Sequence, residues 1–287
     1  AGGGSLPVGD REVEMEDTAG LVATDCFAPG LLEGQVAFVT GGATGIGKEI
    51  CRVLGSVGAQ VVMASRKREN LEAAVGELRG EGIDASFDVF DVRDPSAVRA
   101  VLERLLSGQG RLDIVVNDAA GNFPAPMSSI SPNGFKAIVD IDLLGTYNVS
   151  RAAFDVWLRD NGGSIVNISA PFELRGVAYQ AHVAAAKAGV DSLTRTCAVE
   201  WGPYGIRVNA IAPGSIEATE GLERFTEAVP NAPSRPTNPL GMHGHGTDIA
   251  CLTLFLCSPA ARFVSGQVIA VDGAGSVDML RLAAGRI

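Results

Sequence analysis

The amino-acid sequence predicts an α/β protein whose core is a doubly wound parallel sheet of seven strands, with helices on both faces. Seven short runs rich in β-branched residues recur along the chain, and amphipathic stretches separate them. The many Gly and Ala residues and the few aromatic ones suit helices packed closely on an apolar sheet. Because parallel strands need crossover connections, the alternation indicates right-handed β-α-β units in one layered domain.

Each element is expected from its own residues, since alternating or continuous apolar runs predict strands and a period of 3.6 predicts helices. The expected strands are residues 35–40 (QVAFVT), 60–65 (QVVMAS), 85–92 (ASFDVFDV), 112–117 (LDIVVN), 164–169 (SIVNIS), 206–213 (IRVNAIAP) and 267–273 (QVIAVDG). The expected helices start at Gly45, span residues 68–80 and 95–106, follow Ser131 as one long helix, run through Lys187, and start again at Thr247.

The chain divides into a tail, one domain and a second tail. Residues 1–33 open with AGGGS, turn acidic at DREVEMED and lack a basic n-region, so a flexible tail is expected and no signal peptide. Residues 34–276 are expected to form the single domain, and residues 277–287 a C-terminal tail. Within the domain, residues 215–242 are rich in Pro and Gly with one short helical stretch. An insertion at the carboxyl ends of parallel strands is usually a substrate lid.

Charge and composition exclude several classes of function. A formal net charge of −10 disfavours nucleic acid and anionic membranes, except where Lys and Arg cluster locally. The apolar runs fall short of the roughly 20 residues that a membrane span needs. The five cysteines form no CxxC pair. We therefore expect reduced thiols, an intracellular protein that is not secreted, and no membrane insertion.

The turn after the first expected strand, TGGATGIG, is a candidate dinucleotide-binding loop. Its three glycines supply a tight turn, close approach of the backbone to a pyrophosphate, and close packing of the following helix, whose N-terminus faces the anion. A strand before this loop and a helix after it favour cofactor binding over the alternative, a tight turn without a ligand. The candidate contacts are Gly41, Thr44, Gly45, Ile46 and Gly47.

The end of the second expected strand, VVMASRK, indicates which dinucleotide binds. An NAD site would present an acid there to the ribose 2′-hydroxyl, but Ser65, Arg66 and Lys67 take that position. An arginine fork and a lysine charge suit a 2′-phosphate, so NADPH is predicted, with a solvated basic turn as the alternative. Asp91 and Val92 end the third expected strand, where the adenine ring would lie.

With TGGATGIG, NDAAG, the segment that ends in Lys187, and IAPG in this order, the chain resembles the short-chain dehydrogenase/reductases over about residues 32–275. AAGNF (119–123), SPNGFK (131–136), DIDLLGTYNVSR (140–151), AVEWGPYGIRVN (198–209) and EATEGLERF (217–225) narrow the likeness to the peroxisomal-type 2,4-dienoyl-CoA reductases. The resemblance implies a Rossmann-like fold and NADPH as cofactor. It adds as cofactor contacts Asn117, Ala119, Lys187, Pro213, Gly214 and Ile216.

The resemblance also shows what this chain lacks. The superfamily's serine falls at Ala170, its tyrosine at Val183 and its asparagine at Asp142, which leaves only Lys187. A carbonyl reductase needs the tyrosine as an acid that protonates the nascent alkoxide. The dienoyl reductases show the same losses, and the resemblance keeps Lys187 as a catalytic residue. Because an acid replaces the family's asparagine, Asp142 is the second candidate, as a residue that positions a water or relays the proton with the aid of His182 or Tyr179. A structural pairing of Asp142 with Lys187 is the alternative.

The resemblance further implies a substrate site for an acyl-CoA. Its residues are Arg66, Arg93, Phe123, Ser131, Pro132, Asn133, Tyr179 and His182, and Leu222 and Phe225 of the lid are candidate contacts for the acyl chain. Simpler readings stand beside these: a surface charge for Arg93, a core position for Phe123, and a packed or hydrogen-bonded ring for His182. The MHGHG segment (242–246) has no third ligand in view, so we predict a loop and no metal site.

The predicted function is NADPH-dependent reduction of 2,4-dienoyl-CoA to 3-enoyl-CoA in the β-oxidation of unsaturated fatty acids. The alternatives are reduction of another enoyl or oxoacyl thioester, or an inactive NADP(H)-binding protein. By resemblance the partners are acyl-CoA and further copies of the chain, in a homotetramer, with no nucleic acid. The peroxisomal matrix is expected by resemblance, but the chain ends in AAGRI and lacks an SKL-type tripeptide, so the cytoplasm stays open.

Overall fold

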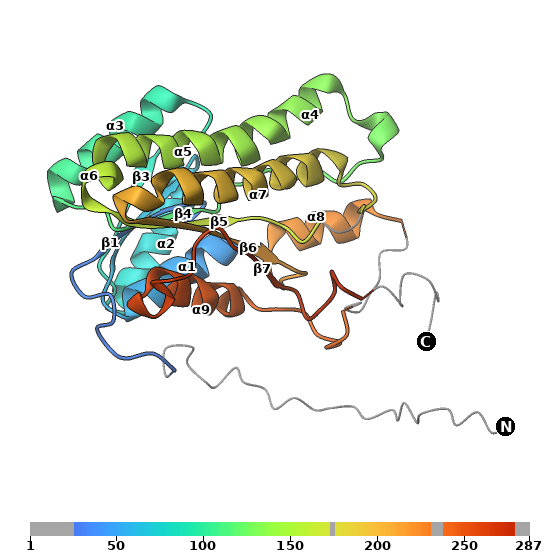
Figure 1. Ribbon diagram of the computed structural model, residues 1–287. Helices are drawn as coiled ribbons and strands as arrows, with labels where there is room; N and C mark the ends of the chain where they lie inside the picture. Colours follow the sequence, from blue (N-terminus) through green and yellow to red (C-terminus); the bar gives the residue numbers. More distant parts are fainter. Residues whose placement is uncertain (1–25, 173–175, 231–237, 279–287) are drawn as a thin grey trace.

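The structure is a computed structural model that describes residues 26–172, 176–230 and 238–278 (Figure 1). Its centre is one sheet of seven parallel strands in the order β3-β2-β1-β4-β5-β6-β7, which confirms the predicted doubly wound fold. The strands are β1 (Val36–Thr40), β2 (Gln60–Ser65), β3 (Ala85–Val89), β4 (Ile114–Asn117), β5 (Gly163–Ile168), β6 (Ile206–Pro213) and β7 (Val268–Val271).

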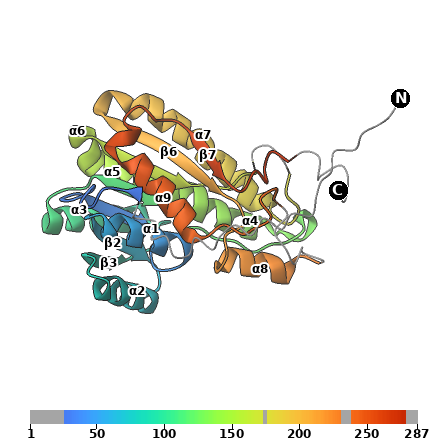
Figure 2. The same cartoon turned by 90° about the horizontal axis from the view of Figure 1, so that it is seen from below.

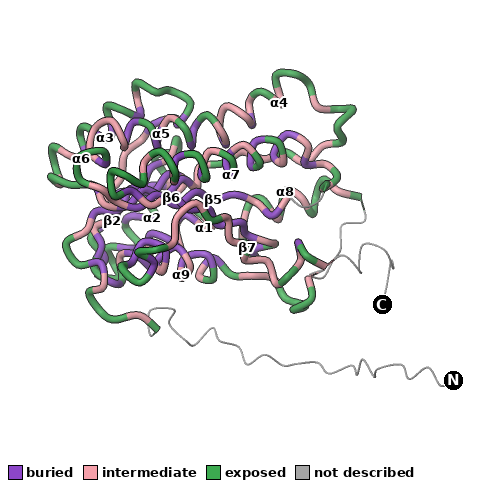
Figure 3. The backbone as a smooth tube through the Cα atoms, in the orientation of Figure 1, coloured by how far each residue is buried: buried purple, intermediate pink, exposed green. Residues whose placement is uncertain are grey.

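Helices cover both faces of this sheet (Figure 2). One apolar cluster lies between the sheet and α1 (Gly45–Ser56), α2 (Arg68–Gly80) and α9 (Gly246–Cys257). A second cluster lies between the other face and α3 (Pro95–Gln109), α5 (Gly145–Ala153) and α7 (Ala181–Trp201). The tube in Figure 3 is buried almost continuously along the central strands. Each fully buried Val, Leu or Ile in these clusters stabilises the fold by about 1.5–3 kcal/mol.

The long helix expected after Ser131 is interrupted twice. It consists of α4 (Pro132–Val139), a π turn η4 (Asp140–Leu144), α5, a second π turn η5 (Phe154–Leu158) and α6 (Arg159–Asn161). A π turn inserts one residue into the helical repeat and is frequent at functional sites. Here the first π turn carries Asp142, whose side chain is fully buried.

Two expected boundaries are wrong. The third strand ends at Val89, so Asp91 and Val92 lie in the turn that follows it. Residues 27–33 do not belong to a flexible tail, because Leu32 is fully buried and its N–H donates to the Val57 carbonyl oxygen at 3.0 Å. Burying an apolar side chain at the base of the first cluster ties this segment to the domain. The earlier part of the expected N-terminal tail, residues 1–25, lies outside the described residues, as do residues 279–287 of the C-terminal one.

The expected lid contains the helix α8 (Glu220–Ala228), and residues 231–237 of it lie outside the described part of the chain. Its two stems pair through Ile216 and Gly244, and the Gly244 N–H donates to the Ser215 carbonyl oxygen at 2.9 Å. In Figure 1, α8 lies beyond the carboxyl ends of the strands, on the side where parallel sheets bind ligands. None of the helices in the described residues has the length and apolar composition required to cross a membrane.

Candidate active site

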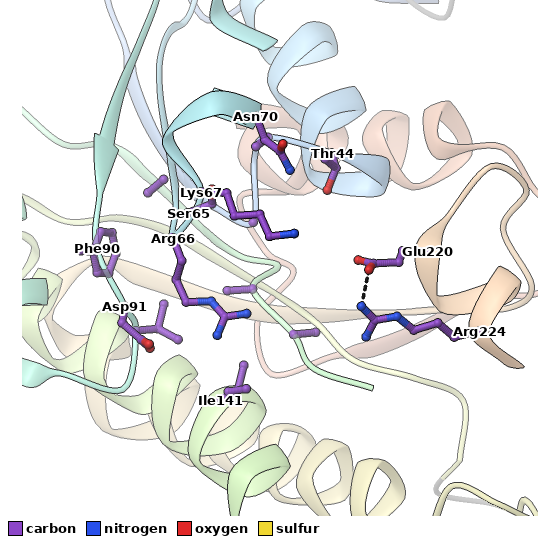
Figure 4. A pocket seen from close by; sticks show the side chains of 16 residues that line it. Thr44, Ser65, Arg66, Lys67, Asn70, Phe90, Asp91, Ile141, Glu220 and Arg224 are labelled. Atoms are coloured by element: carbon purple, nitrogen blue, oxygen red, sulfur yellow. Dashed lines mark hydrogen bonds and ion pairs between the residues drawn. The ribbon is translucent and has the colours of Figure 1, made fainter. Parts of the chain in front are cut away.

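A cavity lies at the carboxyl ends of β1 and β2, where the predicted dinucleotide loop, the basic turn and the lid meet (Figure 4). It is called the dinucleotide cavity below. Eight of the predicted cofactor residues line it: Gly41, Thr44, Ser65, Arg66, Lys67, Asp91, Val92 and Ala119. Eight further residues line it that the sequence reading did not single out for this site: Ala43, Ala64, Asn70, Phe90, Ala120, Ile141, Glu220 and Arg224.

The glycine loop adopts a shape that other residues would not tolerate. Gly41 and Gly45 have φ angles of +73° and +52°, a region that favours glycine. At Gly47 a Cβ atom would lie 2.6 Å from the Gly41 carbonyl oxygen, so the first turn of α1 is packed directly on the loop. Thr44, the N-cap residue of α1, lines the cavity, so the N-terminus of this helix lies at its edge, where a helix terminus favours an anion.

The opposite wall of the dinucleotide cavity is basic. Figure 4 shows the side chains of Arg66 and Lys67 extending from the turn after β2 into the cavity, with Asp91 beside Arg66. The cavity residues at the end of β2 are Ser65, Arg66 and Lys67, so basic side chains take the position at which an NAD site presents an acid to the ribose. The residues present fit the dinucleotide phosphates that the sequence predicted.

Lys187 and Asp142 form a buried pair on the α7 face of the sheet. The Lys187 Nζ donates to the Ile168 carbonyl oxygen at 2.7 Å and lies 3.7 Å from the Asp142 Oδ2. The Gly121 N–H donates to the other carboxyl oxygen of Asp142 at 2.7 Å. Burial raises the pKa of the Asp142 carboxyl, against the opposing effects of Lys187 and of the Gly121 N–H. Within the described residues, the Asp142 Oδ2 accepts no hydrogen bond, so one acceptor is left for a ligand or a water.

The two positions that lack the usual hydroxyl groups are apolar. Val183 is 6% exposed and packs in a small cluster with Ile138, Ala186 and Phe172, one helical turn before Lys187. Ala170 follows β5 and offers no polar side-chain atom. A group that protonates a substrate here must therefore come from Asp142, from another neighbour or from water.

His182 is fully buried and contacts the loop that contains Phe123. Its Nε2 lies 3.1 Å from the Phe123 carbonyl oxygen, and the two rings meet edge to face with centroids 4.3 Å apart. Burial lowers the pKa of the imidazole, so the neutral form dominates at pH 7. A carbonyl oxygen can only accept, so Nε2 carries the proton and donates it. This leaves Nδ1 as an acceptor, and no group in the described residues donates to it. This fits the hydrogen-bonded role weighed above and argues against an acid.

The predicted substrate residues fall into two groups. The Phe123 ring lies against the start of α4, where a Cβ on Gly134 would lie 3.0 Å from its Cζ and where the Ser131 Oγ accepts from the Gly134 N–H at 3.1 Å. Pro132 and Asn133 belong to the same first turn. Tyr179, with a φ of +68°, accepts from the Ala125 N–H at 3.0 Å. The structure thus brings these residues together along the loop of residues 121–125.

Arg93 and several predicted cofactor contacts lie elsewhere. The Arg93 Nε donates to the Asp91 Oδ1 at 2.9 Å, and Arg93 does not line the dinucleotide cavity. Asn117 does not line this cavity either, and its Nδ2 donates to the Ser150 Oγ and the Asn167 Oδ1. Gly45, Ile46, Gly47, Lys187, Pro213, Gly214 and Ile216 are also outside its lining. Their contacts with a cofactor stay predictions, since Lys187 and residues 213–216 would meet its far end.

Arg224 on the lid helix is a candidate binding residue that the sequence reading missed. It forms an ion pair with Glu220, shown as the dashed line in Figure 4, and its Nη1 donates to the Asn122 carbonyl oxygen at 2.8 Å. The lone arginine in the otherwise acidic stretch EATEGLERF was the available signal.

The two histidines of the MHGHG segment have other partners: His243 Nδ1 lies 2.6 Å from the Ser215 Oγ, and His245 caps α9. The described residues contain no group of three or more His, Cys, Asp or Glu placed to hold a metal ion.

Comparison with known proteins finds relatives over most of the chain. Residues 41–275 match the family described as Enoyl-(Acyl carrier protein) reductase. The peroxisomal 2,4-dienoyl-CoA reductase [(3E)-enoyl-CoA-producing] of Rattus norvegicus is 46% identical, over 86% of this chain and 85% of the relative. Its namesake from Danio rerio is 44% identical over 87% and 84%. Among solved structures, the citronellol catabolism dehydrogenase AtuB of Pseudomonas aeruginosa PAO1 is 39% identical, with a TM-score of 0.78, covering 87% of this chain and 98% of that one.

Proposed function

Because the chain belongs to the short-chain dehydrogenase/reductase family, we propose that it is an NADPH-dependent oxidoreductase that converts 2,4-dienoyl-CoA to 3-enoyl-CoA. Relatives that are 44–46% identical carry this activity in their names. The observation that carries the proposal is the pairing of Lys187 with a buried acid at Asp142, beside apolar residues where a carbonyl reductase keeps hydroxyl groups.

This arrangement suits the reduction of a conjugated thioester. When bound, the cofactor would supply a hydride, and addition of this hydride to the δ carbon of the substrate would break the γ–δ double bond. The electron pair moves along the conjugated system to the thioester oxygen, and the resulting dienolate takes one proton at the α carbon to leave a β–γ double bond. No alkoxide forms at the carbon that accepts the hydride, so the missing tyrosine is not required there.

The chain's own residues then have two tasks. Lys187 would hold the nicotinamide ribose hydroxyls and would place a positive charge near the oxygen on which negative charge develops. Asp142 uses its Oδ2, which accepts no hydrogen bond from the described residues, to position a water or to relay the proton to the α carbon, while its Oδ1 stays fixed by the Gly121 N–H. The buried, neutral His182 keeps the adjoining loop in place through the Phe123 carbonyl oxygen.

The acyl-CoA would lie between the loop of residues 121–125, the start of α4 and the lid. Arg224 and Arg66 approach the dinucleotide cavity from opposite sides (Figure 4), so either can meet a phosphate of CoA despite the acidic character of the whole chain. Phe123 and the first turn of α4 would contact the thioester arm, and Leu222 and Phe225 of α8 are half-buried candidates for the acyl chain. Arg93 is held by Asp91 and would have to exchange partners to take part.

Assembly and compartment belong to the same proposal. The outer faces of α5 and α7 expose apolar side chains, with Tyr147 46% and Val199 78% exposed. Pairing of these helices between copies would cover them, which supports a homotetramer. The named relatives are peroxisomal, which favours the peroxisomal matrix over the cytoplasm. Size-exclusion chromatography with light scattering, and fractionation of cells that express the natural protein, would test the two points.

The first experiment mixes the purified protein with NADPH and 2,4-decadienoyl-CoA, and follows cofactor oxidation and loss of the dienoyl chromophore together. Equal loss of both, with a product identified as the 3-enoyl thioester, is the expected result. Acetoacetyl-CoA and NADH serve as controls. Activity on acetoacetyl-CoA alone would assign the enzyme to oxoacyl thioesters, and tight NADPH binding without turnover of either substrate would favour an inactive binding protein.

A further inference from the structure

Asp118 lies directly behind the glycine loop and has no role in the mechanism above. It follows β4, which is hydrogen-bonded to β1 in the middle of the sheet. The backbone N–H groups of Asp118 and Ala119 both donate to the Thr40 Oγ1 at 3.2 Å. Thr40 is the last residue of β1 and immediately precedes the loop, so the start of the NDAAG segment is fixed to the base of the cofactor site.

The carboxyl group of Asp118 is packed closely against two glycines of the loop. A Cβ atom on Gly47 would lie 2.5 Å from the Asp118 Oδ2, and a Cβ on Gly41 would lie 2.9 Å from the same oxygen. The Gly47 N–H also donates a hydrogen bond to this carboxyl group. Asp118 therefore contacts the same loop that would hold the pyrophosphate.

The charges around this carboxyl group do not balance. Lys187 from α7 and Asp142 from the π turn both act on it electrostatically, and it in turn acts on the Cys51 thiol of α1. The fully buried Asp142 and the half-buried Asp118 thus share the field of one ammonium, and in such a cluster one acid tends to keep its proton. Burial raises the pKa of Asp118 to about 8, in spite of Lys187 and the Gly47 N–H. Burial also raises the pKa of the Cys51 thiol far above any pH at which cofactor binding would be measured.

We propose that Asp118 is a positioning residue that supports the cofactor loop in its protonated form, so that dinucleotide binding takes up a proton at this carboxyl group. An ionised Asp118 would place a negative charge against the loop that receives the negative pyrophosphate, and like charges at short range disfavour each other. The protonated acid supports the loop without that repulsion. This inference rests on the proposed binding of NADPH.

The test is a series of NADPH titrations by fluorescence, at pH values from about 7 to about 9.5, on the wild-type protein and on Asp118→Asn. The range begins above the pKa of a phosphate monoester, about 6, so that the 2′-phosphate itself does not titrate. For the wild type, Kd should rise about tenfold between about pH 7 and pH 9, because the binding-competent protonated fraction falls by that factor. The isosteric amide keeps its shape without a proton to lose, so its Kd should change less than twofold. Arg66, Lys67 and Lys187 are unchanged in the variant, so the difference between the two curves isolates Asp118.

Calorimetry provides a second measurement that needs no variant. Near pH 8, the heat of NADPH binding in two buffers of different ionisation enthalpy should reveal net uptake of about half a proton. A wild-type Kd that does not change with pH, no buffer-dependent heat, or an equally steep curve for Asp118→Asn would each overturn the inference while leaving NADPH binding intact. Failure of the wild type to bind NADPH at any pH would overturn both this inference and the proposed function.

Discussion

The Lys187 Nζ lies 3.7 Å from the Asp142 Oδ2, and neither residue exposes more than 7% of its side chain. The same ammonium donates to the Ile168 carbonyl oxygen, and the same carboxyl group accepts from the Gly121 N–H. The pair therefore joins α7, β5 and the loop after β4 at one point. A buried pair of this kind is weak grounds for stability, because desolvation offsets the attraction. Because the pair lies in the candidate active site, a functional role explains it better than a contribution to stability.

Replacing Asp142 by Asn or Ala should lower kcat by about a hundredfold to ten-thousandfold, which is the usual range for a lost general acid–base group. NADPH affinity should change much less, since Asp142 does not line the dinucleotide cavity. Steady-state rates with 2,4-decadienoyl-CoA and separate cofactor titrations would distinguish the two effects. Undiminished turnover in Asp142→Ala would leave this residue with a structural role only.

Restoring the family's tyrosine should harm the protein. Val183 is packed against Ile138, Ala186 and Phe172, so a phenol ring at this position overfills the cluster. Overpacking costs about 1–3 kcal/mol, and Val183→Tyr should unfold at a lower temperature without a gain in dienoyl reduction. Val183→Ile, which adds a single methylene, is the matched control and should shift Tm less. A Val183→Tyr protein that keeps its Tm and reduces acetoacetyl-CoA would contradict this account of the site.

Most of the fold could be predicted because its signals are local. The seven strands are nearly continuous apolar runs, and all seven appear in the sheet with ends within about three residues of those expected. The exceptions were set by tertiary contacts. The third strand stops at Val89, and Leu32 joins the core through a hydrogen bond to Val57 that no pattern in an acidic, glycine-rich segment foretells. The π turn at Asp142 adds one residue to a helical repeat, a change too small to alter the periodicity of a long helix.

Site residues that belong to sequence motifs could be predicted, whereas residues brought to the site by tertiary contacts could not. The glycine loop and the basic turn after β2 were found from spacing and position, and both line the cavity. Arg224 was missed because it reaches the Asn122 carbonyl oxygen from 102 residues away, across a lid whose path depends on tertiary packing. Asp118 was overlooked for a similar reason, since its contact with Gly47 exists only because β1 and β4 are neighbours.

Arg66→Ala should weaken NADPH binding far more than NADH binding. A hydrogen bond to a charged group contributes about 1.5–3 kcal/mol, so the Kd for NADPH should rise by about tenfold to a hundredfold. The Kd for NADH should stay within about threefold of the wild-type value, since NADH has no 2′-phosphate. Arg68→Ala is a suitable control, because Arg68 is two residues further on and outside the cavity lining. Equal losses for both cofactors would remove the assignment of Arg66 to the 2′-phosphate.

Arg224→Met should raise KM for the acyl-CoA about tenfold, the effect of losing one charge-assisted contact, and leave kcat less affected. Methionine keeps much of the apolar stem, so the lid helix should still pack. Glu220→Gln is the matched control, because it removes the ion-pair partner but keeps the cation near the cavity. That variant should bind acyl-CoA at least as well as the wild type. A KM unaffected by Arg224→Met would confine this arginine to holding Asn122.

The free energy of unfolding should depend on pH through the ionisation of Asp118. The pKa of this carboxyl is raised to about 8 in the folded protein, against about 3.9 in an unfolded chain. Between these values the native state keeps a proton that the unfolded chain releases. The free energy of unfolding therefore falls as the pH rises through this window, by at most about 1.4 kcal/mol for each pH unit, and this contribution is flat above it.

Asp118→Asn removes that titration, so calorimetric melting of both proteins from about pH 5 to pH 8 should show the variant gaining stability relative to the wild type at every step. If Lys187 instead held Asp118 ionised, the result would be the opposite. The free energy of unfolding of the wild type would rise relative to that of the variant from about pH 2 to pH 4, and the difference would then stay constant. Parallel melting curves across the whole range would mean that Asp118 ionises in the folded protein much as it does in water.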